Sequence, residues 1–391
     1  MICLMMPVAE RVSADKVTTI RGETLDGRVE SLDAKRLLFF ANNGEHESIS
    51  KENICSILLD KTGEKKKQVT DSLVVTVSGS RLSTRELSME LEKFRFENPD
   101  LGKFVVPAEK VLVVFLPGKN EKIENIIKAC DKYGYKHGNR DYLIARDPKG
   151  ELRSLEGVLK KIGTAKITFH FETEDRTVSR SRVPAIFLAE LSGAKDKPHC
   201  RVELENGDIL RVGFLGIADG KITADETALG EVTLGLDVIS AIHFDSDKVV
   251  GLSDMKPVEV KEYGFFDVTF KHRMNQSVGG EKMVLAGKTY SRGIGMHSFS
   301  ELAWDLDGKY SLFLATAGID DLVRPKGNAG LKVIGDGKVL FEHSALTGRD
   351  KPVDLKVDVS GVSRLKIQVN FGEDNLGVSD YVDIASPRLV K

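Results

Sequence analysis

The sequence predicts a mainly β protein, in which two repeated small β-barrel or meander modules, joined by a short helix, precede a β-sandwich. Three observations lead to this fold class. Apolar residues alternate with polar ones in many short segments, which is the pattern of half-buried strands. Two long stretches match each other at a constant offset. After Phe244 the composition changes to strands separated by Gly and Asp turns.

The composition is that of a globular protein, and it lacks the excess of basic residues that nucleic-acid binding requires. The 391 residues are 41% hydrophobic and 30% charged, and the net charge is −2. Binding to nucleic acid would need a basic excess, so we expect none, and we interpret Lys65–Lys67 as a solvated loop. No segment approaches the roughly 18 apolar residues of a membrane span. The four cysteines are far apart, which argues against a Cys-x-x-Cys zinc site and a disulfide framework.

Residues 1–13 begin with a short apolar stretch, Ile2–Met6, and no basic residue precedes it. A secretory signal needs a basic start and an apolar core of about 7–15 residues. Two interpretations therefore stay open for residues 1–13: the remnant of a signal peptide, or a disordered lead-in.

Two copies of one strand-rich module are predicted at residues 14–117 and 141–247. At the start of each copy, Gly27 is matched with Gly150, in front of a segment that ends in an apolar strand. Each copy continues with short alternating segments and turn residues, which is typical of small antiparallel barrels. The meander resembles Sm-like or SH3-like small barrels, and this resemblance concerns the fold alone.

The register between the two copies is constant over much of the module. Gly79 aligns with Gly207, an offset of 128 residues (207 − 79), and Phe94 meets Ile222 at the same offset. Unrelated segments seldom keep one register without a gap over a whole module. The two stretches are therefore predicted to share one fold.

The linker at residues 118–140 is predicted to contain a helix. Ile123, Ile126, Ile127 and Cys130 are spaced i, i+3, i+4 and i+7, which places them on one helical face. We expect this face to pack on a barrel. The alternative is a helix that binds a partner protein.

Residues 248–391 are predicted to form a separate β-sandwich. Leu331–Glu342 has the pattern of a hairpin whose turn is Asp336-Gly337. Trp304 alternates with Leu302 and therefore shares its face. We expect this tryptophan in the core rather than on an exposed sugar platform.

An ordered series of motifs runs through this C-terminal part. Tyr290 opens the stretch Tyr-Ser-Arg-Gly-Ile-Gly-Met-His-Ser, the motif Ala-x-x-Gly-Ile-Asp-Asp ends at Asp321, and a closing Asp-x-x-Asp-x-Ala begins at Asp380. In this order the motifs closely resemble the NPCBM family of carbohydrate-binding modules, over about a third of the chain. The resemblance implies a jelly-roll-like β-sandwich that is non-catalytic and binds galactose-type or related glycans outside the cytoplasm.

Six residues are candidates for carbohydrate binding, because Asp, Tyr and His side chains hydrogen-bond sugar hydroxyls. These residues are His297, Asp320, Asp321, Asp380, Tyr381 and Asp383. The histidine has a structural alternative as a buried brace for a strand, and the aspartates have alternatives as turn caps or structural hydrogen-bond acceptors. No cofactor is required by the sequence. Calcium near Asp320 and Asp321 is the one metal that the residue types suggest.

The closing motif departs from the family pattern, which usually reads Asp-His-Ala-Asp-Trp-Ala. Tyr381 stands where the family has histidine, and Ile384 stands where it has tryptophan. Tyr381 can stack or donate a hydrogen bond in place of the histidine. The lost tryptophan removes a ring of the kind that holds flat ligands, and it favours an alternative in which sugar binding has been lost.

We expect an exported protein, periplasmic, extracellular or on the cell surface, that binds a glycan or polysaccharide without catalysis. The first alternative is a structural or protein-interaction protein of the cell surface whose sandwich no longer binds sugar. The second is a glycoside hydrolase or its accessory subunit, because a catalytic carboxylate pair needs no local spacing. The chain has no Gly-x-Ser-x-Gly, His-Glu-x-x-His or Walker motif, so no catalytic residue is predicted.

Overall fold

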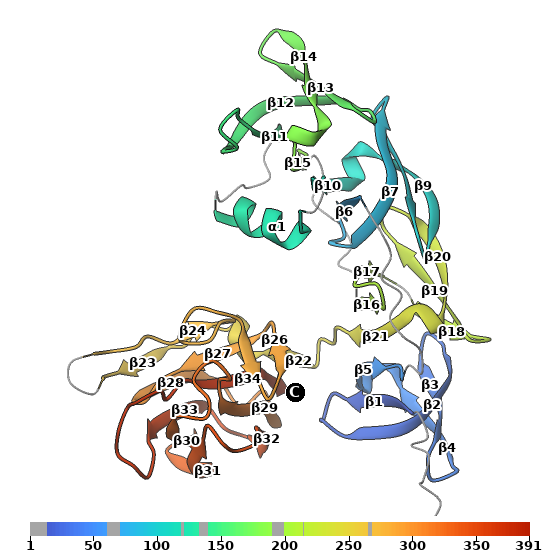
Figure 1. The fold of residues 1–391 in the computed structure, drawn as a ribbon. Coiled ribbons are helices and arrows are strands. Elements are labelled where there is room, and N and C mark those ends of the chain that lie inside the picture. Colours follow the sequence, from blue (N-terminus) through green and yellow to red (C-terminus); the bar gives the residue numbers. More distant parts are fainter. Residues whose placement is uncertain are drawn as a thin grey trace, which may run out of the picture. The chain divides into compact units, whose positions relative to one another are not determined.

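The computed structural model describes residues 14–60, 71–118, 121–132, 140–189, 199–213, 215–264 and 268–391. The expectations for residues 1–13 and for Lys65–Lys67 lie outside these residues. The chain divides into two compact units (Figure 1). The first contains the described residues up to Asp245 apart from Thr19–Glu23, and the second contains Thr19–Glu23 and Ser246–Lys391.

The first unit is built from four small barrels of the same design. Each consists of an antiparallel meander, a single 3-10 turn and a closing strand. The first barrel comprises β1 (Asp15–Thr19), β2 (Thr24–Leu32), β3 (Arg36–Ala41), β4 (His46–Ser50), the turn Lys51–Asn53 and β5 (Ile54–Leu58). The second comprises β6 (Ser72–Thr76), β7 (Arg81–Glu90), β8 (Lys93–Asn98), β9 (Gly102–Pro107), the turn Ala108–Lys110 and β10 (Val111–Phe115).

The third and fourth barrels repeat this order. The third comprises β11 (Asp141–Arg146), β12 (Leu152–Ile162), β13 (Lys166–Phe171), β14 (Glu174–Ser179), the turn Arg180–Arg182 and β15 (Ala185–Phe187). The fourth comprises β16 (Cys200–Leu204), β17 (Ile209–Val212), β18 (Leu215–Ala218), β19 (Lys221–Glu226), β20 (Gly230–Gly235), the turn Leu236–Val238 and β21 (Ile239–Phe244). Each expected repeat copy thus holds two barrels.

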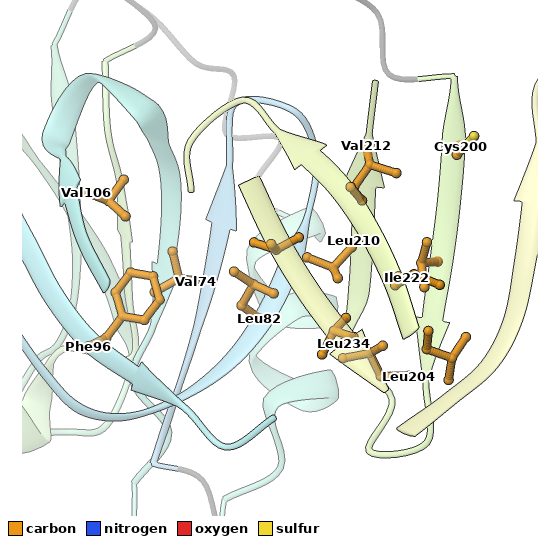
Figure 2. Packing of buried hydrophobic residues seen from close by; sticks show 14 of the residues in the cluster. Val74, Leu82, Phe96, Val106, Cys200, Leu204, Leu210, Val212, Ile222 and Leu234 are labelled. Carbon is orange, nitrogen blue, oxygen red and sulfur yellow. The ribbon is translucent and has the colours of Figure 1, made fainter. Parts of the chain in front are cut away.

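Every barrel closes because its first strand pairs with its last: β1 with β5, β6 with β10, β11 with β15 and β16 with β21. Alternating side chains of these strands point inward, and their apolar members form one continuous core through the four barrels. Figure 2 shows a part of this core contributed by the second and fourth barrels, where Val74, Leu82 and Phe96 lie near Leu210 and Leu234.

The strand pairing corrects the match of Gly27 with Gly150. Gly27 pairs with Asp15 and Gly157 pairs with Asp141, so these two glycines are equivalent. A Cβ on Gly27 would lie 2.2 Å from the Phe40 carbonyl oxygen, and one on Gly157 would lie 2.2 Å from that of His170. The requirement for glycine is therefore a close backbone approach within the barrel, which local sequence similarity does not reveal.

The barrels join through strand pairs that repeat across the unit. Strand β5 pairs with β21, and β10 pairs with β15 in the same way. Likewise β2 contacts β18, and β7 contacts β12. The first barrel is thus joined to the fourth as the second is joined to the third, and β7 and β17 connect the two pairs.

Buried polar groups hold the second and fourth barrels together. The Glu226 carboxylate, 1% exposed, accepts hydrogen bonds of 2.9 Å from both Thr76 Oγ1 and Ser80 Oγ. The buried Asp208 carboxylate, also of the fourth barrel, accepts a hydrogen bond of 2.6 Å from Asn98 Nδ2 of the second barrel. Burial raises the pKa of Asp208, although hydrogen bonds oppose the rise. Both acids are held by neutral donors.

Helix α1 (Ile123–Lys132) follows the second barrel. Ile126 and Cys130 are buried against a small cluster that includes Phe115 and Phe187 from β10 and β15. The predicted amphipathic helix and its packing on a barrel are therefore confirmed. No helix of the described residues is long and apolar enough to cross a membrane.

The second unit is an antiparallel β-sandwich, and the mainly β fold class is confirmed. One sheet has the order β24 (Arg273–Met274), β27 (Gly293–Met296), β34 (Val382–Val390), β29 (Leu312–Ile319) and β32 (Val353–Asp358), with β22 (Val249–Gly251) also paired to β34. The other has the order β23 (Glu259–Glu262), β28 (Ser300–Asp305), β33 (Arg364–Phe371), β30 (Asn328–Gly335) and β31 (Lys338–Thr347). Strands β25 (Met283–Leu285) and β26 (Lys288–Tyr290) form a separate hairpin.

The core of the sandwich lies between the two sheets. Trp304 on β28 is 0% exposed, as predicted, and its Nε1 donates a hydrogen bond of 3.1 Å to the Met255 carbonyl. This bond satisfies the polar atom of an otherwise apolar side chain. The tryptophan is therefore a core residue and offers no surface to a ligand.

Candidate glycan-binding site

The candidate site lies at one end of the sandwich, where residues 263–264 and 268–272 meet the loops 297–299, 320–327 and 372–381. Backbone hydrogen bonds join them, since Tyr263 pairs with Phe299 and the Asp320 N–H donates to the Tyr381 carbonyl. We call this end the loop end.

Exposed apolar side chains gather at the loop end. Six of the nine large apolar side chains that are exposed in the described part of the second unit lie in its loops. They are Tyr263, Val268, Phe270, Leu322, Leu376 and Val378. A concentration of exposed apolar surface on one part of a domain marks an interaction site.

Three aromatic rings form the centre of this surface. The Phe270 ring, 36% exposed, stacks on the His297 ring with centroids 4.3 Å apart and planes at 23°. Tyr381 meets His297 edge-on at 5.7 Å and lies 6.0 Å from Phe270. One face of Phe270 is thus covered by His297, and such a supported ring is suited to stacking on a flat, apolar ligand surface.

The strand register explains how Phe270 reaches His297. Strand β24 pairs with β27, Arg273 opposite Gly295. The residues just before β24 therefore run alongside those just after β27. Phe270 lies outside the motifs that identify the C-terminal part, so it is not among the residues predicted from the sequence. Its only signal there is a local excess of aromatic residues.

His297 is 4% exposed, and its Nδ1 lies 2.7 Å from the Ser298 carbonyl oxygen. Burial lowers the pKa of His297, although this hydrogen bond opposes the shift. In the neutral ring the Nδ1–H donates to the carbonyl, so Nε2 is an acceptor. The histidine therefore braces the loop and supports Phe270, and its predicted contact with a ligand stays a prediction.

Asp380 is a buried support for the same loops. It is 0% exposed; Ser298 Oγ donates to its Oδ2, and the Asn328 N–H donates to its Oδ1 at 3.0 Å. Burial raises the pKa of Asp380 to about 6. The carboxylate thus ties three loops together and is not itself open to a ligand.

Asp320 and Asp321 cap the turns around them. The Asp320 oxygens accept hydrogen bonds from the Leu322 and Val284 N–H groups, and those of Asp321 accept from the Ala286 and Gly287 N–H groups. These contacts occupy the carboxylates that were considered for calcium. No group of three or more His, Cys, Asp or Glu residues is placed to hold a metal ion in the described ranges.

Asp383 lies in the interior, 0% exposed, and neither of its carboxylate oxygens has a hydrogen-bond partner among the residues that the structure describes. Burial, reinforced by the neighbouring Asp320 carboxyl, raises the pKa of Asp383 to about 9. The side chain is therefore protonated at neutral pH. Of the six candidates, His297 and Tyr381 join the aromatic centre, Asp320, Asp321 and Asp380 accept hydrogen bonds from nearby turns and loops, and Asp383 lies in the interior on β34.

Residues 248–390 match the model of the NPCBM/NEW2 domain. Within the second unit, residues 248–390 are an NPCBM/NEW2 domain. A curated relative from Renibacterium salmoninarum, named "Putative endo-alpha-N-acetylgalactosaminidase", is 31% identical over 98 residues, which are 25% of this chain and 6% of the relative's length.

Solved structures that contain carbohydrate-binding modules are also similar to this chain. A CBM51 module of Clostridium perfringens GH95, in complex with methyl-galactose, is 25% identical, covers 36% of this chain and 99% of its own, and has a TM-score of 0.33. The CBM51-2 and INT domains of Clostridium perfringens ZmpB, in complex with GlcNAc, are 22% identical, cover 48% of this chain and 42% of their own, and have a TM-score of 0.34.

The two departures from the family motif have different consequences in this NPCBM/NEW2 domain. Ile384 is 0% exposed and belongs to the core between the sheets. Its position therefore offers no ring to a ligand, and the missing tryptophan says little about binding. Tyr381 instead lies in the aromatic centre, beside His297 and Phe270.

Proposed function

We propose that the NPCBM/NEW2 domain binds a galactose-type glycan through the loop end, without catalysis. The observation that carries this proposal is the exposed Phe270 ring, backed by His297 and flanked by Tyr381. Such a ring stacks on the apolar face of a sugar, and the Tyr381 hydroxyl supplies a hydrogen-bonding group for the sugar hydroxyls. The name of the Renibacterium relative is consistent with a galactose-configured ligand.

The burial of three of the four candidate aspartates supports a non-catalytic role. Glycoside hydrolysis needs two carboxyl groups that face the scissile bond. Asp320, Asp380 and Asp383 are at most 2% exposed, so they do not reach a bound sugar. Export is part of the proposal, because a polysaccharide-binding protein of this kind works where such glycans are displayed.

A glycan array followed by affinity electrophoresis, with and without added calcium, tests the proposal. Phe270→Ala should weaken binding at least tenfold, about 1.4 kcal/mol. Val339→Ala is the matched control, since Val339 is 43% exposed and lies near the hairpin turn of β30 and β31. A wild-type protein that is folded by Trp304 fluorescence and is retained by no glycan would contradict the proposal.

A second candidate function is protein interaction through the barrels, which one pocket favours. The pocket, of about 320 Å³, lies between the second and third barrels. Its apolar lining comes from Met89, Pro107, Ala108, Val158, Leu159 and Leu188. Light scattering is the test: a defined oligomer in the wild type and a monomer in Ala108→Phe, with no glycan binding, would favour this role over the first.

A further inference from the structure

We infer that the cavity between the second and third barrels binds a segment of a partner protein, by taking a leucine-sized side chain that stands next to a lysine or arginine. This inference rests on the second candidate function, protein interaction through the barrels, and it does not depend on glycan binding. The cavity has a volume of about 320 Å³, and its whole lining consists of described residues of the two barrels. This volume lies at the lower end of the range for ligand pockets.

The equivalent junction, between the fourth and first barrels, shows which apolar group the cavity lacks. Ala108 begins the 3-10 turn after β9, and its N–H donates to the Glu92 carbonyl at 2.8 Å. Leu236 begins the turn after β20, and its N–H donates to the Gly220 carbonyl at 2.9 Å. The two residues are therefore equivalent, and both pack against the barrel core. Because Ala108 lines the cavity, the cavity lies where the other junction has the isopropyl group of a leucine.

The same comparison shows that a basic side chain is also missing. Gly27 and Gly157 are equivalent, so Arg28 of the first barrel and Val158 of the third barrel are equivalent too. Both side chains are exposed, and Val158 lines the cavity. One junction thus has a leucine and an arginine where the other has an alanine and a valine.

Two acidic side chains line the cavity without a basic partner. Glu92 and Glu109 are both exposed. Neither has an ion-pair partner among the described residues, whereas Arg140, the basic residue of the lining, pairs with Glu156 at 3.5 Å. Opposite charges attract one another over distances of about 10 Å at moderate salt. A ligand that carries a cationic group beside its apolar group therefore complements the cavity.

The remaining acid of the lining is already used by the fold. One oxygen of Asp141 accepts a hydrogen bond from the Leu159 N–H at 2.7 Å, and the other accepts one from the Ala189 N–H at 2.8 Å. The wall next to Asp141 is therefore fixed before any ligand arrives, and a preorganised site loses little entropy on binding.

Apolar surface continues beyond the cavity, which favours a protein segment over a small molecule. Five large apolar side chains are exposed in the described part of the first unit, and three of them lie in the lining or next to it in the chain. Val158, 45% exposed, belongs to the lining. Val105, 60% exposed, lies two residues before Pro107 on β9, and Leu91, 84% exposed, directly precedes Glu92. A small molecule inside the cavity would leave these side chains in water, whereas a protein segment covers them.

Selection from a random-peptide phage library against the immobilised full chain tests the inference. The enriched peptides should share a leucine, isoleucine or methionine next to a lysine or arginine. Fluorescence polarisation with one such peptide, synthesised and labelled, then gives its dissociation constant. Ala108→Leu, which copies Leu236, should raise this constant at least tenfold, because it fills the space for the apolar side chain. Glu92→Gln combined with Glu109→Gln should raise it about fivefold at low salt and less at high salt.

The matched control is Leu38→Ala, since Leu38 is 46% exposed on the first barrel, and it should leave the constant unchanged. Melting curves by circular dichroism show whether the variants are folded; if Ala108→Leu is not, Ala108→Val and the exposed glutamine variants still test the cavity. No enrichment, or equal affinity for the wild type and these variants, would overturn the inference, while light scattering still tests the second candidate function. A wild-type oligomer that Ala108→Leu dissociates would mean that a second copy of the chain occupies the cavity, which also overturns the inference.

Discussion

Asp383→Asn should stabilise the C-terminal sandwich above pH 7. Burial and the neighbouring Asp320 raise the pKa of Asp383 to about 9, against about 3.9 in an unfolded chain. Between these values the folded state holds a proton that the unfolded state lacks. The contribution of the Asp383 carboxyl to the free energy of unfolding is therefore fully present below about pH 4. As the pH rises toward 9, this contribution falls by about 1.4 kcal/mol per pH unit.

The assay is urea unfolding followed by Trp304 fluorescence. Trp304 is the only tryptophan of the chain and lies in the sandwich core, so its signal reports on this unit. Between pH 7 and 8.5 the wild type should lose about 2 kcal/mol of unfolding free energy through Asp383. The pKa of Asp380, about 6, and the lowered pKa of His297 lie below this range. Asparagine has no charge to gain, so the variant should show no loss from this position.

The matched control is Asp247→Asn, since Asp247 is exposed in the same unit. This variant should keep the wild-type slope. The reasoning would be refuted if Asp383→Asn kept that slope, or if it were less stable at every pH. The second result would mean that Asp383 is ionised in the fold and held by a cation, and added calcium should then raise the melting temperature of the wild type.

Two further predictions concern the barrels, and both are measured by denaturation followed by far-ultraviolet circular dichroism. Gly157→Ala should destabilise its barrel by about 1–3 kcal/mol or more, because the new Cβ would lie 2.2 Å from a carbonyl oxygen. Gly213→Ala should change little, since no atom lies within 4 Å of a Cβ there. Ser80→Ala should cost about 1–3 kcal/mol, because it removes one donor from the buried Glu226 carboxylate. An unchanged midpoint for Gly157→Ala or Ser80→Ala would contradict the corresponding contact.

Local patterns in the sequence predicted the elements that depend on neighbouring residues. The stripe from Ile123 to Cys130 predicted α1, and the Asp336-Gly337 turn predicted the hairpin of β30 and β31. Trp304 was placed in the core from alternation alone. These features follow from strand and helix periodicity, which are properties of short segments.

Features that depend on distant residues were not predictable in this way. The four-barrel organisation rests on first-to-last strand closure, such as β6 with β10, and on contacts such as Asn98 with Asp208. Phe270 joins the site because β24 pairs with β27. The burial of Asp320, Asp380 and Asp383 likewise depends on contacts between separate loops. The spacing of residues along the sequence does not directly encode these long-range contacts.

Hydrogen exchange of the full chain, measured peptide by peptide with and without a bound galactose-terminated glycan, tests the central claim most directly. Ligands slow exchange where they order or cover the backbone. We predict slower exchange in loops 263–272 and 372–381 at the loop end, with the barrels unchanged. Protection confined to the barrels, or to other parts of the sandwich, would contradict the assignment of the site.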